Sequence, residues 1–218
     1  MSRSLRIVRR SPRTRAVVLV LHGGQARSDE PTTWRQLSVW RSRWLAGSLA
    51  RAGRRHGVSV AFLRYAVRGW NDGAPVADAR WALDELRQTW PGVPIGVVGY
   101  SMGGRVALRL VGEPDVAAMA TVSAWVEAAD LPLMEPTADL PVLLLHGADD
   151  QVTTPCGSLL TATRLREAGA LARADVEQPD THAMVRRART WHRLVAEHLL
   201  AHLLPDEVTV SRPPSTPR

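Results

Sequence analysis

The feature that most constrains this chain is the segment Gly99-Tyr100-Ser101-Met102-Gly103-Gly104. An apolar run over residues 94–98 indicates a strand in front of it, and residues 105–110 indicate a helix behind it. A serine flanked by small residues at such a turn is strained, and its hydroxyl is lifted above the end of a sheet. The pattern alone is a weak signal. Ser101 is therefore a candidate nucleophile that still needs a base and an orienting acid.

The next strong apolar run supplies the acid. Residues 141–145 are apolar and continue as His146-Gly147-Ala148-Asp149-Asp150. The run is short and bounded by Pro and Gly, which is typical of a strand buried on both faces. The turn after it places two carboxylates at the carboxyl end of that strand. The spacing favours Asp150 as the orienting acid, with Asp149 as the alternative.

The base should follow the acid if the chain order is Ser, Asp, His. His182 lies in a short loop between the strand-like residues 172–177 and a final helix. Such loops carry the ligand-facing groups of an α/β sheet, so His182 is the predicted base. The other histidines have structural interpretations: His22 and His146 hold loops, His56 is a solvated surface residue, and His192, His198 and His202 lie in the final helix, where His198 and His202 pack. No third ligand accompanies His198 and His202, so we expect no metal site.

Acyl transfer also needs hydrogen-bond donors for the oxyanion. The backbone N–H of Met102, directly after the nucleophile, is the first. The second should come from the glycine-rich loop after the apolar run at residues 16–21. Gly24 is the predicted donor there, and Gln25 is the alternative. The competing interpretation is that Gly23 and Gly24 merely end a strand.

These motifs together resemble the alpha/beta-hydrolase family over about residues 14–203. They are Leu21-His22-Gly23-Gly24, the segment around Ser101, His146-Gly147-x-x-Asp150 and His182. The resemblance implies a three-layer α/β/α sandwich with a mostly parallel sheet and a triad of Ser101, His182 and Asp150. It also implies hydrolysis of an ester, thioester or related acyl bond without a cofactor. Small esterase and thioesterase-like members are the most similar.

Two other functions stay open. An acyltransferase or thioesterase acting on carrier-bound acyl groups would use the same triad. A binding protein could keep the fold as a scaffold, since fold does not determine function.

Little sequence is available for a cap over the site. Only residues 125–141 separate a strand at residues 119–124 from the strand at Val142, which is enough for a loop or one small helix. We therefore expect an open pocket. Arg68, Trp70 and Trp125 are the candidate rim residues, and plain packing is the alternative for them. The same choice between core packing and pocket wall applies to Trp34, Trp40 and Trp44.

The chain of 218 residues is long enough for one sizeable core. Amphipathic stretches at residues 34–52 and 76–90 alternate with apolar runs, which favours helices crossing between parallel strands. We expect one domain over residues 1–204, whose residues 1–14 form a basic arm or, at residues 5–8, an edge strand. Residues 205–218 are rich in Pro, Ser and Thr, and we expect them to be disordered.

Charge and cysteine content bear on partners and compartment. The net charge is +7, and arginine takes the place of lysine throughout the sequence. This uniform use of arginine indicates coding bias more than a nucleic-acid-binding groove. Cys156 is the single cysteine and is expected to be buried. With no secretory or bilayer-spanning segment, the expected location is the cytoplasm. The expected partner is a small acyl substrate, with no nucleic acid and no membrane insertion, while monomer and homodimer remain open.

Overall fold

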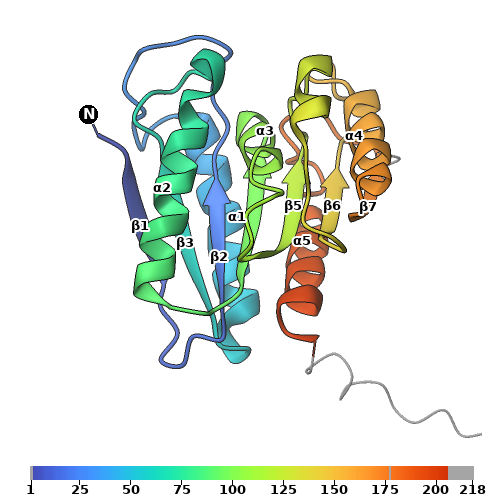
Figure 1. Ribbon diagram of the computed structural model, residues 1–218. Coiled ribbons are helices and arrows are strands. Elements are labelled where there is room, and N and C mark those ends of the chain that lie inside the picture. Colours follow the sequence, from blue (N-terminus) through green and yellow to red (C-terminus); the bar gives the residue numbers. More distant parts are fainter. Residues whose placement is uncertain (1, 177, 206–218) are drawn as a thin grey trace, which may run out of the picture.

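A seven-stranded sheet runs through the computed structural model, which describes residues 2–176 and 178–205. The strand order is β1-β3-β2-β4-β5-β6-β7. The strands are β1 (Ser4–Arg9), β2 (Ala16–Leu21), β3 (Val58–Arg64), β4 (Ile95–Tyr100), β5 (Val116–Val122), β6 (Pro141–Leu145) and β7 (Leu171–Asp175). All neighbours are parallel except β1, which pairs antiparallel with β3. The carboxyl ends of the parallel strands therefore meet at one edge, the upper edge in Figure 1.

Helices cover both faces of the sheet, which gives the three layers that the sequence predicts (Figure 1). The helices are α1 (Leu37–Ala52), α2 (Ala74–Thr89), α3 (Met102–Leu108), α4 (Pro155–Glu167) and α5 (Ala188–Leu203), with short 3-10 turns η1 (Gly53–Arg55), η2 (Asn71–Gly73) and η3 (Ala128–Leu133). Helices α1 and α5 pack on one face, and α2, α3 and α4 pack on the other. Parallel strands need such crossover connections.

The core is divided by the sheet into two apolar clusters. Along β2, Leu19 belongs to the cluster under α2, whereas Val18 and Val20 belong to the cluster under α1 and α5. This alternation follows from the two-residue period of a strand. Every residue of β2 is buried, and full burial of a Leu or Val side chain contributes about 1.5–3 kcal/mol. The predicted strands at residues 16–21 and 141–145 are confirmed.

The structure describes the amino-terminal segment, for which the sequence left two alternatives, but only the first residue of the predicted carboxyl-terminal tail. Residues 4–9 form the edge strand β1, which was one of the two alternatives for the amino-terminal segment. On β1, Leu5 and Ile7 pack against the core under α2. Of the predicted tail, residues 206–218 lie outside the described residues.

Two helices begin later than the sequence indicates. Helix α1 starts at Leu37 rather than at Trp34. Helix α5 starts at Ala188 and does not include Met184, which adopts a left-handed backbone with φ of 51° that an α-helix does not allow. Between β5 and β6 the described chain carries only the short 3-10 helix η3, which agrees with the expectation of a loop or one small helix in place of a cap.

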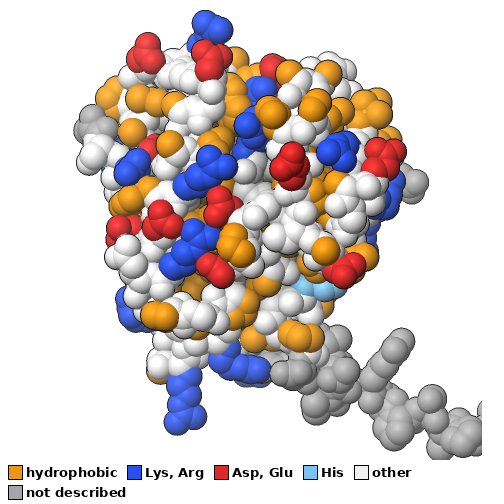
Figure 2. All heavy atoms as spheres, viewed as in Figure 1, with side chains coloured by type: hydrophobic (Ala, Val, Ile, Leu, Met, Phe, Trp, Pro, Cys, Tyr) orange, Lys and Arg blue, Asp and Glu red, His pale blue; other side chains and the backbone are white. Residues whose placement is uncertain are grey.

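Acidic and basic side chains are interspersed on the face that carries α2, as Figure 2 shows. Arg87 there pairs with Asp84, Glu113 and Asp115.

In the described ranges, none of the helices has the length and apolar character needed to cross a bilayer.

Candidate active site

Ser101 lies at the apex of the turn between β4 and α3. Its φ of 54° and ψ of −118° put it in a region that a non-glycine residue rarely adopts. The flanking glycines make the turn possible, because a Cβ on Gly99 would lie 2.0 Å from the carbonyl oxygen of Gly103. A Cβ on Gly103 would lie 2.4 Å from the carbonyl oxygen of Leu21. The strained turn therefore presents the Ser101 hydroxyl at the carboxyl edge of the sheet.

The structure brings Ser101, His182 and Asp150 into one hydrogen-bonded chain. Nε2 of His182 lies 3.0 Å from Oγ of Ser101, and Nδ1 of His182 lies 2.8 Å from Oδ2 of Asp150. The Asp150 side chain is fully buried, whereas the His182 side chain is 17% exposed. This arrangement allows a proton to pass from the serine to an imidazole that a carboxylate orients.

Asp150 is held as a carboxylate by the loop that follows it. Its Oδ1 accepts hydrogen bonds from the N–H groups of Val152 and Thr153, at 2.8 and 3.0 Å. Burial alone would raise the pKa of Asp150, but these N–H groups and His182 outweigh it and hold the pKa below its usual value. Asp150 therefore stays ionised at neutral pH.

Asp149, the alternative acid, points elsewhere. Its side chain is 52% exposed, and its Oδ2 lies 3.5 Å from Nη1 of Arg186. Of the two adjacent carboxylates, the one in contact with His182 is that of Asp150.

Side chains that the sequence analysis gave no site role surround the triad. Thr153 Oγ1 lies 2.9 Å from Oδ2 of Asp150 and 3.1 Å from Nδ1 of His182. The Tyr100 hydroxyl donates to the carbonyl oxygen of His182, and burial raises the pKa of Tyr100 to about 12. His146 holds a loop as predicted, through Ser158, but it also approaches Asp150. The residue types of Thr153, Tyr100 and His146 alone do not indicate that they contact Asp150 or His182.

Asp180 fixes the loop that carries His182. The Asp180 side chain is completely buried, and its Oδ1 accepts from the Thr181 N–H at 2.8 Å. Its Oδ2 accepts from the Arg187 N–H at 3.0 Å and from Nε1 of Trp191 in α5 at 2.8 Å. The loop is thus joined to the carboxyl-terminal helix by one carboxylate.

The candidate oxyanion donors lie beside Ser101. Met102 begins α3, where the first N–H groups have no partner within the helix. Gly24 packs so closely on Met102 that a Cβ would lie 2.5 Å from the methionine methyl carbon and 2.3 Å from the Arg68 carbonyl oxygen. The Gln25 N–H donates to the Arg68 carbonyl at 2.9 Å. Because that hydrogen bond engages the Gln25 N–H, Gly24 remains the predicted second donor and Gln25 its less favoured alternative.

The candidate rim residues pack against protein. Trp70 is 8% exposed, and its ring meets that of Trp125 edge to face. The guanidinium of Arg105 lies over both rings, 4.2 and 4.3 Å from their centroids. Arg68 forms an ion pair with Glu30 at 2.7 Å. The structure thus places these side chains in packing and ion-pair contacts.

Arg105 is a buried cation one turn after Ser101. It pairs with Asp130 at 2.8 Å and with Glu127 at 2.9 Å. These acids come from residues 125–141, so Arg105 ties the nucleophile helix to the segment that replaces a cap. An arginine inside an apolar helix segment was the only sequence signal for this role.

A hollow of about 660 Å³ opens beside the base. It is lined by Arg41, Asp149, Gln151, Val152, Thr181, His182, Ala183 and Arg186. Arg41 comes from α1, and Arg186 follows the His182 loop. Among the three residues of the hydrogen-bonded chain, His182 lines this hollow, whereas Ser101 and Asp150 do not.

Two other expectations need correction. Cys156 is exposed, because the second residue of α4 faces away from the sheet. His198 is buried and its Nε2 lies 3.0 Å from the Met119 carbonyl oxygen, but His202 is exposed near the end of α5. Within residues 2–176 and 178–205, no three His, Cys, Asp or Glu side chains gather as metal ligands.

Comparison with known proteins identifies the fold. The family profile described as "alpha/beta hydrolase fold" matches residues 16–141. No curated protein sequence matches the chain.

Solved structures are similar over almost the whole chain. A putative alpha/beta hydrolase of unknown function from Agrobacterium tumefaciens is 17% identical with a TM-score of 0.68, over 93% of this chain and 92% of its own. An alpha-beta serine hydrolase homologue from Coxiella burnetii is 16% identical with a TM-score of 0.67, over 90% and 91%. A serine hydrolase without a lid from Xanthomonas campestris is 18% identical with a TM-score of 0.65, over 99% and 91%. At these identities the likeness concerns the fold.

Proposed function

The chain belongs to the alpha/beta hydrolase fold family, and from that premise we propose that it is a serine hydrolase that cleaves a carboxylic ester or thioester through an acyl-enzyme. The observation that carries the proposal is the chain of contacts from Ser101 through His182 to Asp150, at 3.0 and 2.8 Å. These distances lie within hydrogen-bond range for both proton-transfer partners.

In the first half-reaction, Ser101 Oγ attacks the acyl carbonyl carbon while its proton passes to Nε2 of His182. The carbonyl electron pair moves onto oxygen, where the N–H groups of Met102 and Gly24 stabilise the negative charge. Collapse of this intermediate breaks the bond to the leaving group, which takes the proton from His182. Asp150 stabilises the imidazolium in between and holds its orientation.

In the second half-reaction, a water molecule attacks the acyl-enzyme. His182 accepts a proton from the water, and the second tetrahedral intermediate collapses to release the carboxylic acid and restore the Ser101 hydroxyl. The 17% exposure of the His182 side chain supports this step, because the attacking water must approach the imidazole. The absence of a cap between β5 and β6 supports a soluble substrate of modest size.

Two further proposals accompany the function. The single sheet supports one domain over residues 1–204. A lone exposed cysteine forms no internal disulfide, which supports work in a reducing compartment such as the cytoplasm.

The test is covalent labelling with a fluorophosphonate probe, followed by peptide mass spectrometry. We expect an adduct on Ser101 in the wild type and in Asp149→Asn, and none in His182→Ala. An adduct on another residue, or none on wild-type protein with an intact fold, would overturn the proposal. Hydrolysis of short-chain nitrophenyl esters, lost in Ser101→Ala, is the matching activity measurement.

A further inference from the structure

A groove lies where α1 leaves the edge of the sheet uncovered. Helix α1 packs mainly over β3 and contacts β1 only in part, so Arg6 and Val8 of β1 remain exposed beside it. The groove has a volume of about 620 Å³ and is lined by Arg6, Ile7, Val8, Trp34, Trp40, Arg43, Trp44 and Phe62. We call it the tryptophan groove. Pockets of this size hold small organic ligands.

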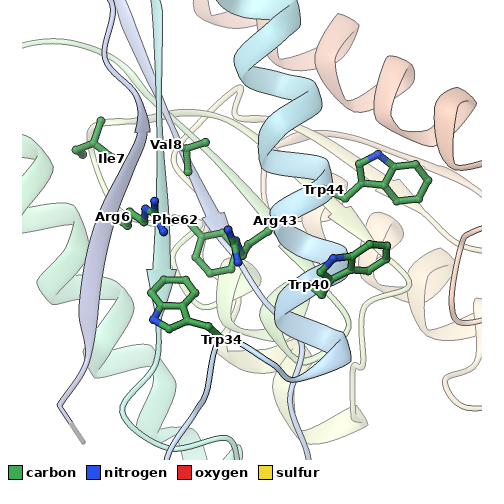
Figure 3. Close-up of a pocket in the computed structure, with 8 residues that line it drawn as sticks. All are labelled: Arg6, Ile7, Val8, Trp34, Trp40, Arg43, Trp44 and Phe62. Carbon is green, nitrogen blue, oxygen red and sulfur yellow. The ribbon is translucent and has the colours of Figure 1, made fainter.

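Large aromatic side chains in the tryptophan groove are left in contact with water. Trp40 is 57% exposed and Trp44 is 42% exposed. They lie on successive turns of α1, with their ring centroids 6.3 Å apart (Figure 3). Trp34 packs on Phe62 beneath, with 5.9 Å between ring centroids. Exposed aromatic surface of this kind marks a binding site more often than a packing defect.

The charge of the tryptophan groove is entirely positive. Its lining contains Arg6 and Arg43 and no acidic residue. Neither guanidinium forms an ion pair with a residue in the described ranges. Helix α1 itself carries no Asp or Glu. Arg43 extends from α1 over the Trp34 ring, with 5.5 Å between the guanidinium carbon and the ring centroid, and in Figure 3 it lies between Trp34 and Trp40.

We propose that the tryptophan groove binds an aromatic carboxylate. A planar ring stacks or packs edge-on against Trp40 and Trp44, as aromatic pairs prefer. The carboxylate then pairs with the guanidinium of Arg43, whose planar fork matches its two oxygens, and with that of Arg6. The groove is a concavity with two separated cations, which suits a compact anion better than a flat protein or lipid surface.

This site is separate from the triad. None of Ser101, Asp150 and His182 lines the tryptophan groove, and β3 and β2 lie between β1 and the strand that precedes Ser101. Ligand binding there requires no chemistry at Ser101. The proposal therefore stands or falls independently of the hydrolase function.

The experiment uses 2-naphthoate as the probe and 2-naphthamide as its neutral counterpart. Isothermal titration calorimetry should give one naphthoate per chain for wild type and for Ser101→Ala. Arg43→Gln and Arg6→Gln should each weaken naphthoate binding about tenfold and leave naphthamide binding unchanged. In ¹H–¹⁵N spectra, naphthoate should shift the indole signals of Trp40 and Trp44, assigned with Trp→Phe variants.

Matched variants decide between this site and its competitors. Arg54→Gln, an exposed arginine outside the groove, should bind like wild type. If naphthoate fails to bind, or if Arg186→Gln weakens binding and Arg43→Gln does not, the proposal is wrong and any anion site is the hollow beside His182. Two further results would overturn it if naphthoate had no effect on them. Dimerisation in sedimentation velocity that depends on Trp40 would indicate a second copy of the chain, and binding to lipid vesicles that depends on Trp40 would indicate a lipid surface.

Discussion

His146 and Asp150 meet with 3.1 Å between Nε2 and Oδ2, on the same carboxylate oxygen that contacts His182. Both side chains are fully buried. Burial lowers the pKa of His146, although the charge of Asp150 opposes this. A neutral His146 with its proton on Nε2 donates to Asp150 and accepts from Ser158 at Nδ1, which lies 2.8 Å from the serine hydroxyl oxygen. His146 thus helps to fix the carboxylate that orients His182.

His146→Gln should therefore slow the reaction without removing it. Hydrogen bonds to charged groups contribute about 1.5–3 kcal/mol, so a loss of about 10- to 150-fold in the rate of fluorophosphonate labelling is expected. His202→Gln, which changes an exposed histidine of α5, is the control and should label at the wild-type rate. An unchanged rate in His146→Gln would show that the contact has no influence on the triad.

Asp150→Asn should be far more damaging than Asp149→Asn. The amide cannot stabilise the imidazolium and favours the wrong tautomer of His182, an effect of about 10⁴-fold in kcat for a comparable triad. Ester hydrolysis in Asp149→Asn should stay within about twofold of wild type, because its carboxylate faces Arg186 and solvent. Reversal of this order would assign the acid to Asp149.

Gly24→Ala should reduce kcat while leaving the fold intact. Its methyl group meets the Arg68 carbonyl at 2.3 Å and must displace the loop that presents the Gly24 N–H. Loss of one oxyanion donor costs about 10²–10³-fold. Gly47→Ala is a matched control, since a Cβ at this helical position meets nothing within 4 Å. Steady-state kinetics and thermal melting of both variants separate a loss of kcat from a loss of stability.

Stability should fall as the pH drops from 6.5 toward 4. Burial, aided by the charge of Arg64 and opposed by the bond to Gly23, lowers the pKa of His22 from 6.5 to about 4. As the pH falls, His22 is protonated in the unfolded chain near pH 6.5 but in the folded protein only near pH 4. The neutral, buried His22 therefore leaves the free energy of unfolding at its full value above pH 6.5, and that free energy falls progressively down to pH 4. The loss is about 3 kcal/mol. Denaturant unfolding at pH 7 and 4.5 measures it, and His22→Gln should show a smaller difference between the two.

Arg105→Met should destabilise the protein more than any surface ion-pair variant. It removes the cation that lies over the Trp70 and Trp125 rings and leaves the 3% exposed carboxylate of Asp130 without its 2.8 Å partner. Breaking a buried pair in this way costs about 3 kcal/mol or more. Arg193→Gln, in the exposed pair with Glu197, should change the free energy of unfolding by less than about 0.5 kcal/mol. Equal effects in the two variants would contradict the role of Arg105.

The sequence predicted the elements whose signals are local. The apolar runs of β2 and β6 and the glycine-flanked turn at Ser101 contain their own structural information, because periodicity and backbone sterics act over a few residues. The positions of Asp150 and His182 at strand ends followed from the same logic. Their contact distances required the tertiary structure.

The contacts missed from sequence join distant segments. Arg105 contacts Asp130, which lies 25 residues further along the chain. No local sequence pattern in either segment indicates that these two side chains form a pair. Cys156 was assigned to the interior from residue type, but position in α4 decided its exposure. The late start of α5 depends on the left-handed Met184, a conformation that sequence pattern does not indicate for methionine.

The buried carboxylate of Asp180 has a consequence for the order in which activity arises during synthesis. It joins the His182 loop to Trp191 in α5, and α5 is translated after every other described element. A nascent chain can complete the sheet and the turn at Ser101 while the imidazole still lacks its anchor. The contact between Asp180 and Trp191 therefore forms last, when α5 docks, and until then the loop that carries His182 lacks this anchor.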